Sequence, residues 1–138
     1  MIPLTVLTPK GIAVDAEVDS FIVPAEKGPL MIEKGYTPTI VSCLPSGVLK
    51  IWMGGKKRFY ALFQGVLHVK ENRAVLLCQN IEEGSTIDRA RAMSKADYDR
   101  NIIEKKDPNT DVEYARISLA KQMARLQAKN LSDGSLDA

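Results

Sequence analysis

Short runs of β-branched, leucine and aromatic residues recur along residues 1–84, and turn residues separate each run from the next. Gly54-Gly55 joins two of these runs and is typical of a two-residue hairpin loop. The strands predicted from the runs are 2–8, 18–24, 48–53, 59–63, 66–70 and 74–79. Closely spaced strands with no helix between them favour an antiparallel sandwich or barrel.

After residue 84 the apolar residues recur at spacings of three and four, which is the spacing of helices. Ser85 stands three residues before Asp88, as in a capping box, and this predicts a first helix over residues 87–103. The segment 107–109, Asp-Pro-Asn, should end that helix, because proline disfavours the helical conformation in the residue before it.

A second helix is predicted after this break. Thr110 and Glu113 repeat the capping-box spacing, and the helix should continue to about Leu131. Its expected apolar face consists of Val112, Ala115, Leu119, Met123 and Leu126. Alanines should let the two helices approach closely as an antiparallel hairpin: Ala90, Ala92 and Ala96 on the first helix, and Ala120, Ala124 and Ala128 on the second.

The amino-acid composition differs between the two parts of the chain. Residues 1–84 hold eight of the nine glycines and six of the seven prolines, whereas residues 85–138 hold eight of the thirteen alanines. Glycine and proline punctuate β-structure, and alanine favours helices. The expected fold is therefore mixed β then α: an N-terminal antiparallel β-sandwich over 1–84, followed by a C-terminal two-helix antiparallel hairpin over 85–138.

Charge and cysteine content exclude several function classes. The net charge of the 138 residues is +2, with +9 and −8 in the first part and +10 and −9 in the second, so a broad nucleic-acid interface is not expected. Cys43 and Cys78 lie far apart in sequence and His68 is the single histidine, so neither a metal site nor a disulfide framework is expected. No apolar run reaches the roughly 20 residues of a membrane-spanning helix, and no signal peptide is visible. We therefore expect an intracellular chain that does not insert into a membrane.

No catalytic constellation emerges from the sequence. His68 lies in a predicted strand without a neighbouring Ser or Cys nucleophile, so a surface histidine is favoured over a general base. The segment 54–57, Gly-Gly-Lys-Lys, lacks the spacing of a phosphate loop and is interpreted as a hairpin turn. These observations also argue against a free-standing small-ligand barrel or an esterase-like enzyme.

Two groups of charged residues in the predicted helices are candidates for binding. Lys121, Arg125 and Lys129 share one face of the second helix and should lack carboxylate partners four residues away, which suits docking on an acidic surface or on phosphates. The alternative is a solvated face. On the first helix, Asp88 should cap the N-terminus, and Arg91 should pair with Glu82 or Asp88.

Several segments resemble one family in order and spacing. They are 4–11 (LTVLTPKG), 24–30 (PAEKGPL), 45–51 (PSGVLKI), 64–69 (QGVLHV) and the most specific piece, Ile87-Asp88-x-x-Arg91-Ala92. Together they make the whole chain similar to the epsilon subunit of rotary F-type ATP synthases. The resemblance implies the same fold, a β-sandwich and then a helical hairpin.

The resemblance also implies a non-catalytic rotor subunit of the central stalk, which helps to couple ion translocation to ATP synthesis. The sandwich would bind the gamma subunit and the c-ring. The hairpin would switch between a compact and an extended state, and the extended state would reach the alpha and beta subunits of the catalytic head and inhibit ATP hydrolysis. In this interpretation Lys121, Arg125 and Lys129 form the inhibitory basic face. The complex would place the chain peripherally on the cytoplasmic face of the bacterial cell membrane.

In some bacterial members of this family the compact hairpin binds ATP as a regulatory ligand, and no cofactor is otherwise required. The matching positions are Glu82, Ile87, Asp88, Arg91, Ala92 and Arg125. This chain departs from the ATP-binding members at Tyr98 and Lys121, where they have arginines. Because six positions match, a hairpin that acts mainly as an ATP-binding sensor is the alternative to an inhibitory hairpin.

The loop that would contact the c-ring in this family also matches by position. Its residues are Glu26, Lys27, Gly28, Pro29, Leu30, Met31 and Tyr36. Pro29 and Met31 replace the usual glutamate and glycine of the family. We therefore expect the contact with the c-ring at the same place in the fold, with different polar contacts.

Overall fold

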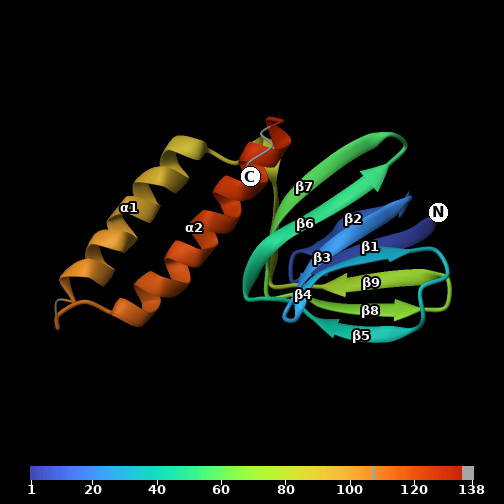
Figure 1. Cartoon of the computed structure of the whole chain (residues 1–138), viewed down its shortest axis with the longest axis horizontal. Helices are drawn as coiled ribbons and strands as arrows, with labels where there is room; N and C mark the ends of the chain where they lie inside the picture. Colours follow the sequence, from blue (N-terminus) through green and yellow to red (C-terminus); the bar gives the residue numbers. More distant parts are fainter. Residues whose placement is uncertain (107, 135–138) are drawn as a thin grey trace.

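Two five-stranded sheets pack face to face, and a pair of helices follows them on one side (Figure 1). The computed structural model describes residues 1–106 and 108–134. The strands are β1 (Ile2–Thr8), β2 (Gly11–Val18), β3 (Ser20–Ala25), β4 (Gly28–Glu33), β5 (Thr39–Ser42), β6 (Ser46–Met53), β7 (Lys56–Phe63), β8 (Val66–Lys70), β9 (Arg73–Leu77) and β10 (Asn80–Glu83). A 3-10 turn, η1 (Gly84–Thr86), leads into helices α1 (Arg89–Lys105) and α2 (Val112–Ser132).

The strand order is β2-β1-β9-β8-β5 in one sheet and β10-β7-β6-β3-β4 in the other. Every pairing is antiparallel except β1 with β9, which run parallel with Leu4 opposite Ala74. The expected sandwich followed by a helical hairpin is confirmed. The sequence missed β2, β4, β5 and β10, which are the four edge strands. An edge strand has one neighbour and a partly solvated surface, so its hydrophobic pattern is weak.

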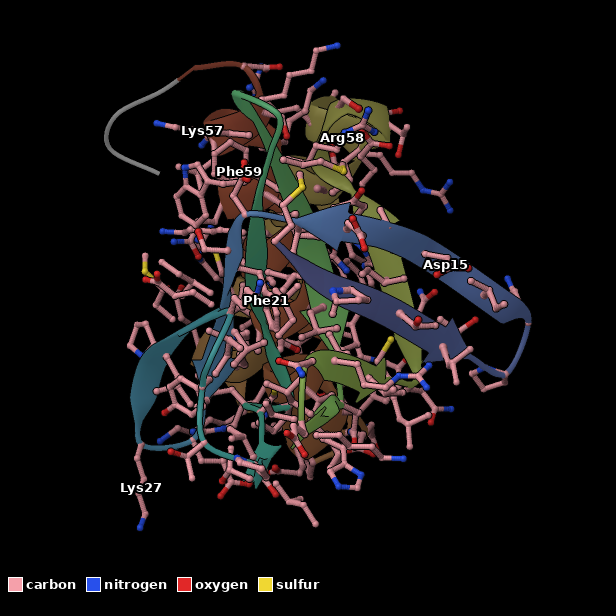
Figure 2. The ribbon with its side chains drawn as sticks, turned by 90° about the vertical axis from the view of Figure 1, so that its right-hand side faces the viewer. Asp15, Phe21, Lys27, Lys57, Arg58 and Phe59 are labelled. Atoms are coloured by element: carbon pink, nitrogen blue, oxygen red, sulfur yellow. The ribbon has the colours of Figure 1, made fainter. Side chains whose placement is uncertain are left out.

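The interior of the sandwich is formed by alternate residues of the central strands. Phe21, Leu49 and Leu62 are fully buried there, and Phe21 lies between the sheets in Figure 2. Strand β7 departs from alternation, because its last four residues, Tyr60–Phe63, are all buried. This continuous apolar run indicates that the strand is covered on both faces.

Helix α2 covers the outer face of β6 and β7. Ala124 and Ala128 pack there against Val48, Ala61 and Phe63 in a second, smaller apolar cluster. Helix α1 lies on the far side of α2, so α2 separates α1 from the sheets (Figure 1). The hairpin is thus in a compact position against the sandwich.

Both helices begin one or more residues later than predicted. The N-cap of α1 is Asp88, whose Oδ1 accepts a hydrogen bond from the Arg91 amide at 3.1 Å, so the expected role of Asp88 is confirmed. The capping box with Ser85 is wrong, because Ser85 lies in η1 and the extended backbone of Ile87 separates it from the helix. The N-cap of α2 is Asp111, in place of the predicted Thr110. The first helix ends at Lys105, just before the predicted break at residues 107–109; Asp107 itself lies outside the described residues.

The seam between the helices is more polar than predicted. Ala92, Ala96 and Ala115 are buried as expected, and so are the polar side chains of Asp99, Ser118 and Gln122. Ala124 and Ala128, expected between the helices, are buried against the sheet. Met123, expected on the apolar face, is 45% exposed. Ala90 and Ala120, expected in the seam, are exposed as well. The helices pack through a narrow strip of small side chains, which leaves flanking positions in solvent.

Candidate functional site

A cleft of about 800 Å³ lies where β10, the start of α1 and the middle of α2 meet. It is lined by Glu82, Thr86, Ile87, Asp88, Arg91, Ala92, Ser94, Lys95, Tyr98, Gln122 and Arg125. The structure therefore brings together all six residues that the sequence singled out for nucleotide binding. Lys121, which occupies one of the two departing positions, is not among the residues that line the cleft.

Local structure explains how these residues gather. Glu82 lies on the edge strand β10, and Ile87 is 8% exposed with an extended backbone, packed in the cluster beneath α2. Asp88 then caps α1, and Arg91 and Lys95 follow one and two turns along the same helix face.

Glu82 and Arg125 form the best-defined contact in the cleft. The Arg125 guanidinium donates from Nε to Oε1 and from Nη2 to Oε2 of Glu82, both at 2.9 Å. The Arg125 Cζ also lies 5.1 Å from the centre of the Phe63 ring. A bidentate pair stacked on an aromatic ring holds the guanidinium in one orientation. Arg125 thus joins α2 to both β10 and β7.

The expected ion pair of Arg91 with Glu82 or Asp88 is wrong. Both Glu82 oxygens are taken by Arg125, and Asp88 accepts from the Arg91 amide instead of its guanidinium. Within residues 1–106 and 108–134, the Arg91 guanidinium makes no hydrogen bond or ion pair.

The basic face of α2 is also less free than predicted. The expected lack of i,i+4 carboxylate partners is wrong for Lys129, which lies 3.5 Å from Asp133 and also donates to the Ser85 carbonyl at 3.3 Å. Arg89 at the start of α1 bonds Asn130 and Asp133 at the end of α2. The pKa of Asp133 is lowered, chiefly by its hydrogen bond from Arg89. Of the three basic residues, Lys121 alone has no such partner among the described residues.

Lys95 and Tyr98 line the cleft together. The Lys95 ammonium lies 3.3 Å from Oδ1 of the buried Asp99 and 4.8 Å from the centre of the Tyr98 ring. The sequence analysis did not predict Lys95 or Gln122 as cleft residues. The i,i+4 spacing of Lys95 from Arg91 could have indicated Lys95.

The loop predicted to contact the c-ring is the β3–β4 hairpin and the segment after it. Lys27 at the hairpin turn points away from the body of the sandwich (Figure 2). Glu26, Pro29 and Met31 are exposed as well. Leu30 and Tyr36 pack partly against the main core, so they hold the hairpin in place.

The remaining candidates for chemistry lie outside the cleft. His68 is exposed on β8, as predicted for a surface histidine. Cys43 and Cys78 are buried and not bonded to each other, and burial raises the pKa of Cys43 to about 11. No group of three or more His, Cys, Asp or Glu side chains among the described residues could hold a metal ion. Neither described helix has the length and apolar character needed to cross a membrane.

Several known proteins are similar to this chain in sequence. The family model for the β-sandwich domain of the ATP synthase delta/epsilon chain matches residues 1–84. The chain is 31% identical over 123 residues to the chloroplastic ATP synthase epsilon chain of Emiliania huxleyi, covering 89% of this chain and 94% of that one. It is 32% identical over 124 residues to the ATP synthase epsilon chain of Caldicellulosiruptor saccharolyticus, covering 90% of each.

A solved structure shares the fold. A chain of the Euglena gracilis mitochondrial ATP synthase, in an assembly of OSCP, F1 and c-ring, superposes with a TM-score of 0.78 at 20% identity. The match covers 92% of this chain and 79% of that chain.

Proposed function

We propose, because this chain belongs to the family of ATP synthase epsilon chains, that it is a central-stalk subunit without a catalytic site of its own. Its role would be to help couple ion translocation to ATP synthesis, as part of a complex held peripherally on the cytoplasmic face of the bacterial cell membrane. The family relationship and the shared fold support this proposal.

The sandwich, residues 1–84, would bind the gamma subunit and the c-ring. The exposed turn of the β3–β4 hairpin supports the second contact, because Lys27 projects from it (Figure 2) and Met31 is exposed beside it. A cysteine at Lys27 is expected to cross-link to the c-ring in the assembled enzyme. A cysteine at exposed Lys10, in the turn between β1 and β2, is the matched control.

The hairpin, residues 85–138, would regulate ATP hydrolysis by leaving the sandwich and inserting its basic face between the alpha and beta subunits. The observation that carries this proposal is the small docking surface of α2. Its apolar contact with the sheet consists of Ala124, Ala128 and the partly buried Leu131, and a single bidentate ion pair joins it to β10. Such a surface is stable enough to form and small enough to be exchanged for a partner of similar chemistry.

Truncation tests the inhibitory role. Removal of the residues from Ile87 onward is expected to raise ATP hydrolysis by the assembled enzyme, with gamma still co-purifying. Unchanged hydrolysis would remove the inhibitory function, and loss of gamma from the preparation would remove the assignment to the stalk.

A hairpin that senses nucleotide is the second candidate function, favoured by one observation. The six residues singled out for ATP line a single cleft of a size suited to a nucleotide. Calorimetry of the isolated chain with ATP, compared with Arg91→Ala, tests this function. Absence of heat at millimolar ATP would end it without affecting the stalk role.

A further inference from the structure

Met123 makes a polar contact, although its side chain is apolar. Its Sδ accepts a hydrogen bond from Nη2 of Arg100 on α1, with 3.3 Å between the two atoms. Asp97, one turn earlier on α1, accepts from Nη1 of the same guanidinium at 3.2 Å and so helps to fix its orientation. Met123 is 45% exposed and belongs to neither apolar cluster. Its contact with Arg100 is therefore a surface link between the two helices.

This link is one of two places in the described part of the chain where side-chain hydrogen bonds join the helices. The other lies at the start of α1, where Arg89 bonds Asn130 and Asp133. The second half of α1 has no sheet beneath it, because α2 lies between (Figure 1). It is held by the seam of small side chains and by a thioether sulfur, which is a weak acceptor. A stronger acceptor at Met123 would therefore tighten the hairpin where few polar contacts hold it.

Oxidation supplies such an acceptor, because an accessible thioether is converted by peroxides to a polar sulfoxide. The sulfur lone pair forms an S–O bond to one oxygen of hydrogen peroxide as the O–O bond breaks. The departing hydroxide takes the proton of the transferred oxygen and leaves as water, so that sulfur loses two electrons and the peroxide gains them. A groove of about 510 Å³ between α2 and the start of β6 is lined in part by Met123 and leaves space for the added oxygen.

We propose that Met123 is an oxidation site for peroxides, and that its sulfoxide binds α1 more firmly to α2 by accepting from Arg100. A sulfoxide oxygen that accepts from a guanidinium forms a charge-assisted hydrogen bond, which is stronger than the present bond to sulfur. Little apolar contact is lost in exchange, because the side chain is already almost half exposed. Met93 on α1 is 51% exposed but has no polar partner among the described residues, so its oxidation should leave the hairpin unchanged.

Hydrogen peroxide treatment of the full chain, followed by amide hydrogen exchange, tests the proposal. Mass spectrometry of peptides should find Met123 and Met93 oxidised at rates within about threefold of each other, because their exposure is similar. In the oxidised chain the amides of residues 98–105 should exchange about threefold more slowly than before treatment, as expected for one stronger surface hydrogen bond. Reduction by a methionine sulfoxide reductase should restore the original exchange rate.

Two pairs of variants separate the proposed contact from a general effect of oxidation. Met123→Leu and Arg100→Ala should each lose the slowing, whereas Met93→Leu and Arg116→Ala, both at exposed positions, should keep it. Far-UV circular dichroism of each variant confirms that the helices are intact. The proposal would be overturned by unchanged or faster exchange in the oxidised chain, or by slowing that persists in Met123→Leu. It would equally be overturned if Met123 stayed unoxidised while Met93 reacted.

Discussion

Glu82 and Arg125 are bound to each other through two hydrogen bonds of 2.9 Å, although they lie 43 positions apart and on different parts of the fold. The pair holds α2 on the edge strand of the sandwich. The same arginine belongs to the basic face that would meet acidic groups of the catalytic head. In the proposed function, Glu82 would compete with those groups for Arg125 while the hairpin is compact.

Opposite effects on ATP hydrolysis are expected when the two members of this pair are changed. Glu82→Gln weakens docking by about 1 kcal/mol and leaves Arg125 available, so the assembled enzyme should be more strongly inhibited. Arg125→Gln weakens docking by the same amount but removes the basic group, so inhibition should be relieved. Hydrolysis rates of the two assembled variants provide the measurement.

Glu83→Gln is the matched control for that comparison. Glu83 is adjacent to Glu82 and pairs only with Arg58, on β7, at 3.6 Å among the described residues. Its change should leave inhibition unaltered. If Glu82→Gln and Arg125→Gln shifted hydrolysis in the same direction, the competition between Glu82 and a partner would be refuted.

Gly84→Ala should loosen α2 from the sandwich. A Cβ at this position would lie 2.3 Å from the Ala128 carbonyl oxygen and 2.3 Å from Ser132 Oγ. The first of these is helix backbone, which cannot turn aside as a side chain can, so docking should lose about 2 kcal/mol. Hydrogen exchange of the α2 amides is expected to become faster, whereas Ser85→Ala next to it should have no effect. Unchanged exchange rates would contradict the prediction and would show that α2 can shift away from position 84 at little cost.

Asp99→Leu should stabilise the hairpin. The Asp99 carboxylate is 1% exposed, and its Oδ2 has no hydrogen-bond partner among the described residues. An apolar side chain with the same branching and the same number of heavy atoms removes a buried, half-satisfied charge, and Lys95 can turn to water, so stability should rise by about 1 kcal/mol. Urea unfolding followed by helical circular dichroism measures the change. Asp97→Asn on the exposed face should stay within about 0.5 kcal/mol of the unmodified chain, and a lower stability for Asp99→Leu would contradict the prediction.

The Cys43 thiol should make stability fall at alkaline pH. Burial, with a smaller contribution from Cys78, raises its pKa from 9.0 to about 11. The unfolded chain then releases the thiol proton at a lower pH than the folded chain does. The contribution of Cys43 to the free energy of unfolding is therefore complete below pH 9 and is lost as pH rises towards 11. Cys43→Ala should flatten the stability profile over this range. Reaction of native Cys43 with iodoacetamide at pH 8 should be slow and should accelerate on unfolding, and fast labelling of the native chain would contradict a buried thiol.

The sequence predicted the central features of the fold because strong local patterns accompany them. Alternating apolar residues identified most inner strands, and the turn residues Gly54-Gly55 marked the β6–β7 hairpin. The edge strands were missed, since their faces are largely solvated. The six cleft residues were named from a family motif. The contacts among these six residues could not be predicted, because the pairing of Glu82 with Arg125 depends on where α2 docks. No local sequence pattern encodes that position.

The same limit explains the errors in the hairpin. Spacing alone places Met123 on the apolar face of α2, whereas the helix turns Ala124 and Ala128 to the sheet and buries Gln122. Small side chains carry little hydropathy signal, yet they decide how closely a helix can approach. Sequence proximity predicts that Arg91 pairs with Glu82 or Asp88, but the docking of α2 pairs Glu82 with Arg125.

The parallel pairing of β1 with β9 sets an order of events during synthesis. Leu4 reaches its neighbour Ala74 only when most of the sandwich has left the ribosome, so the first strand must wait beside β2 with one edge open. Once β9 has closed that edge, α2 can find β6 and β7 already in place. The nascent chain can thus complete its sandwich before the helical hairpin is made, so that the hairpin docks on a surface that no longer depends on it.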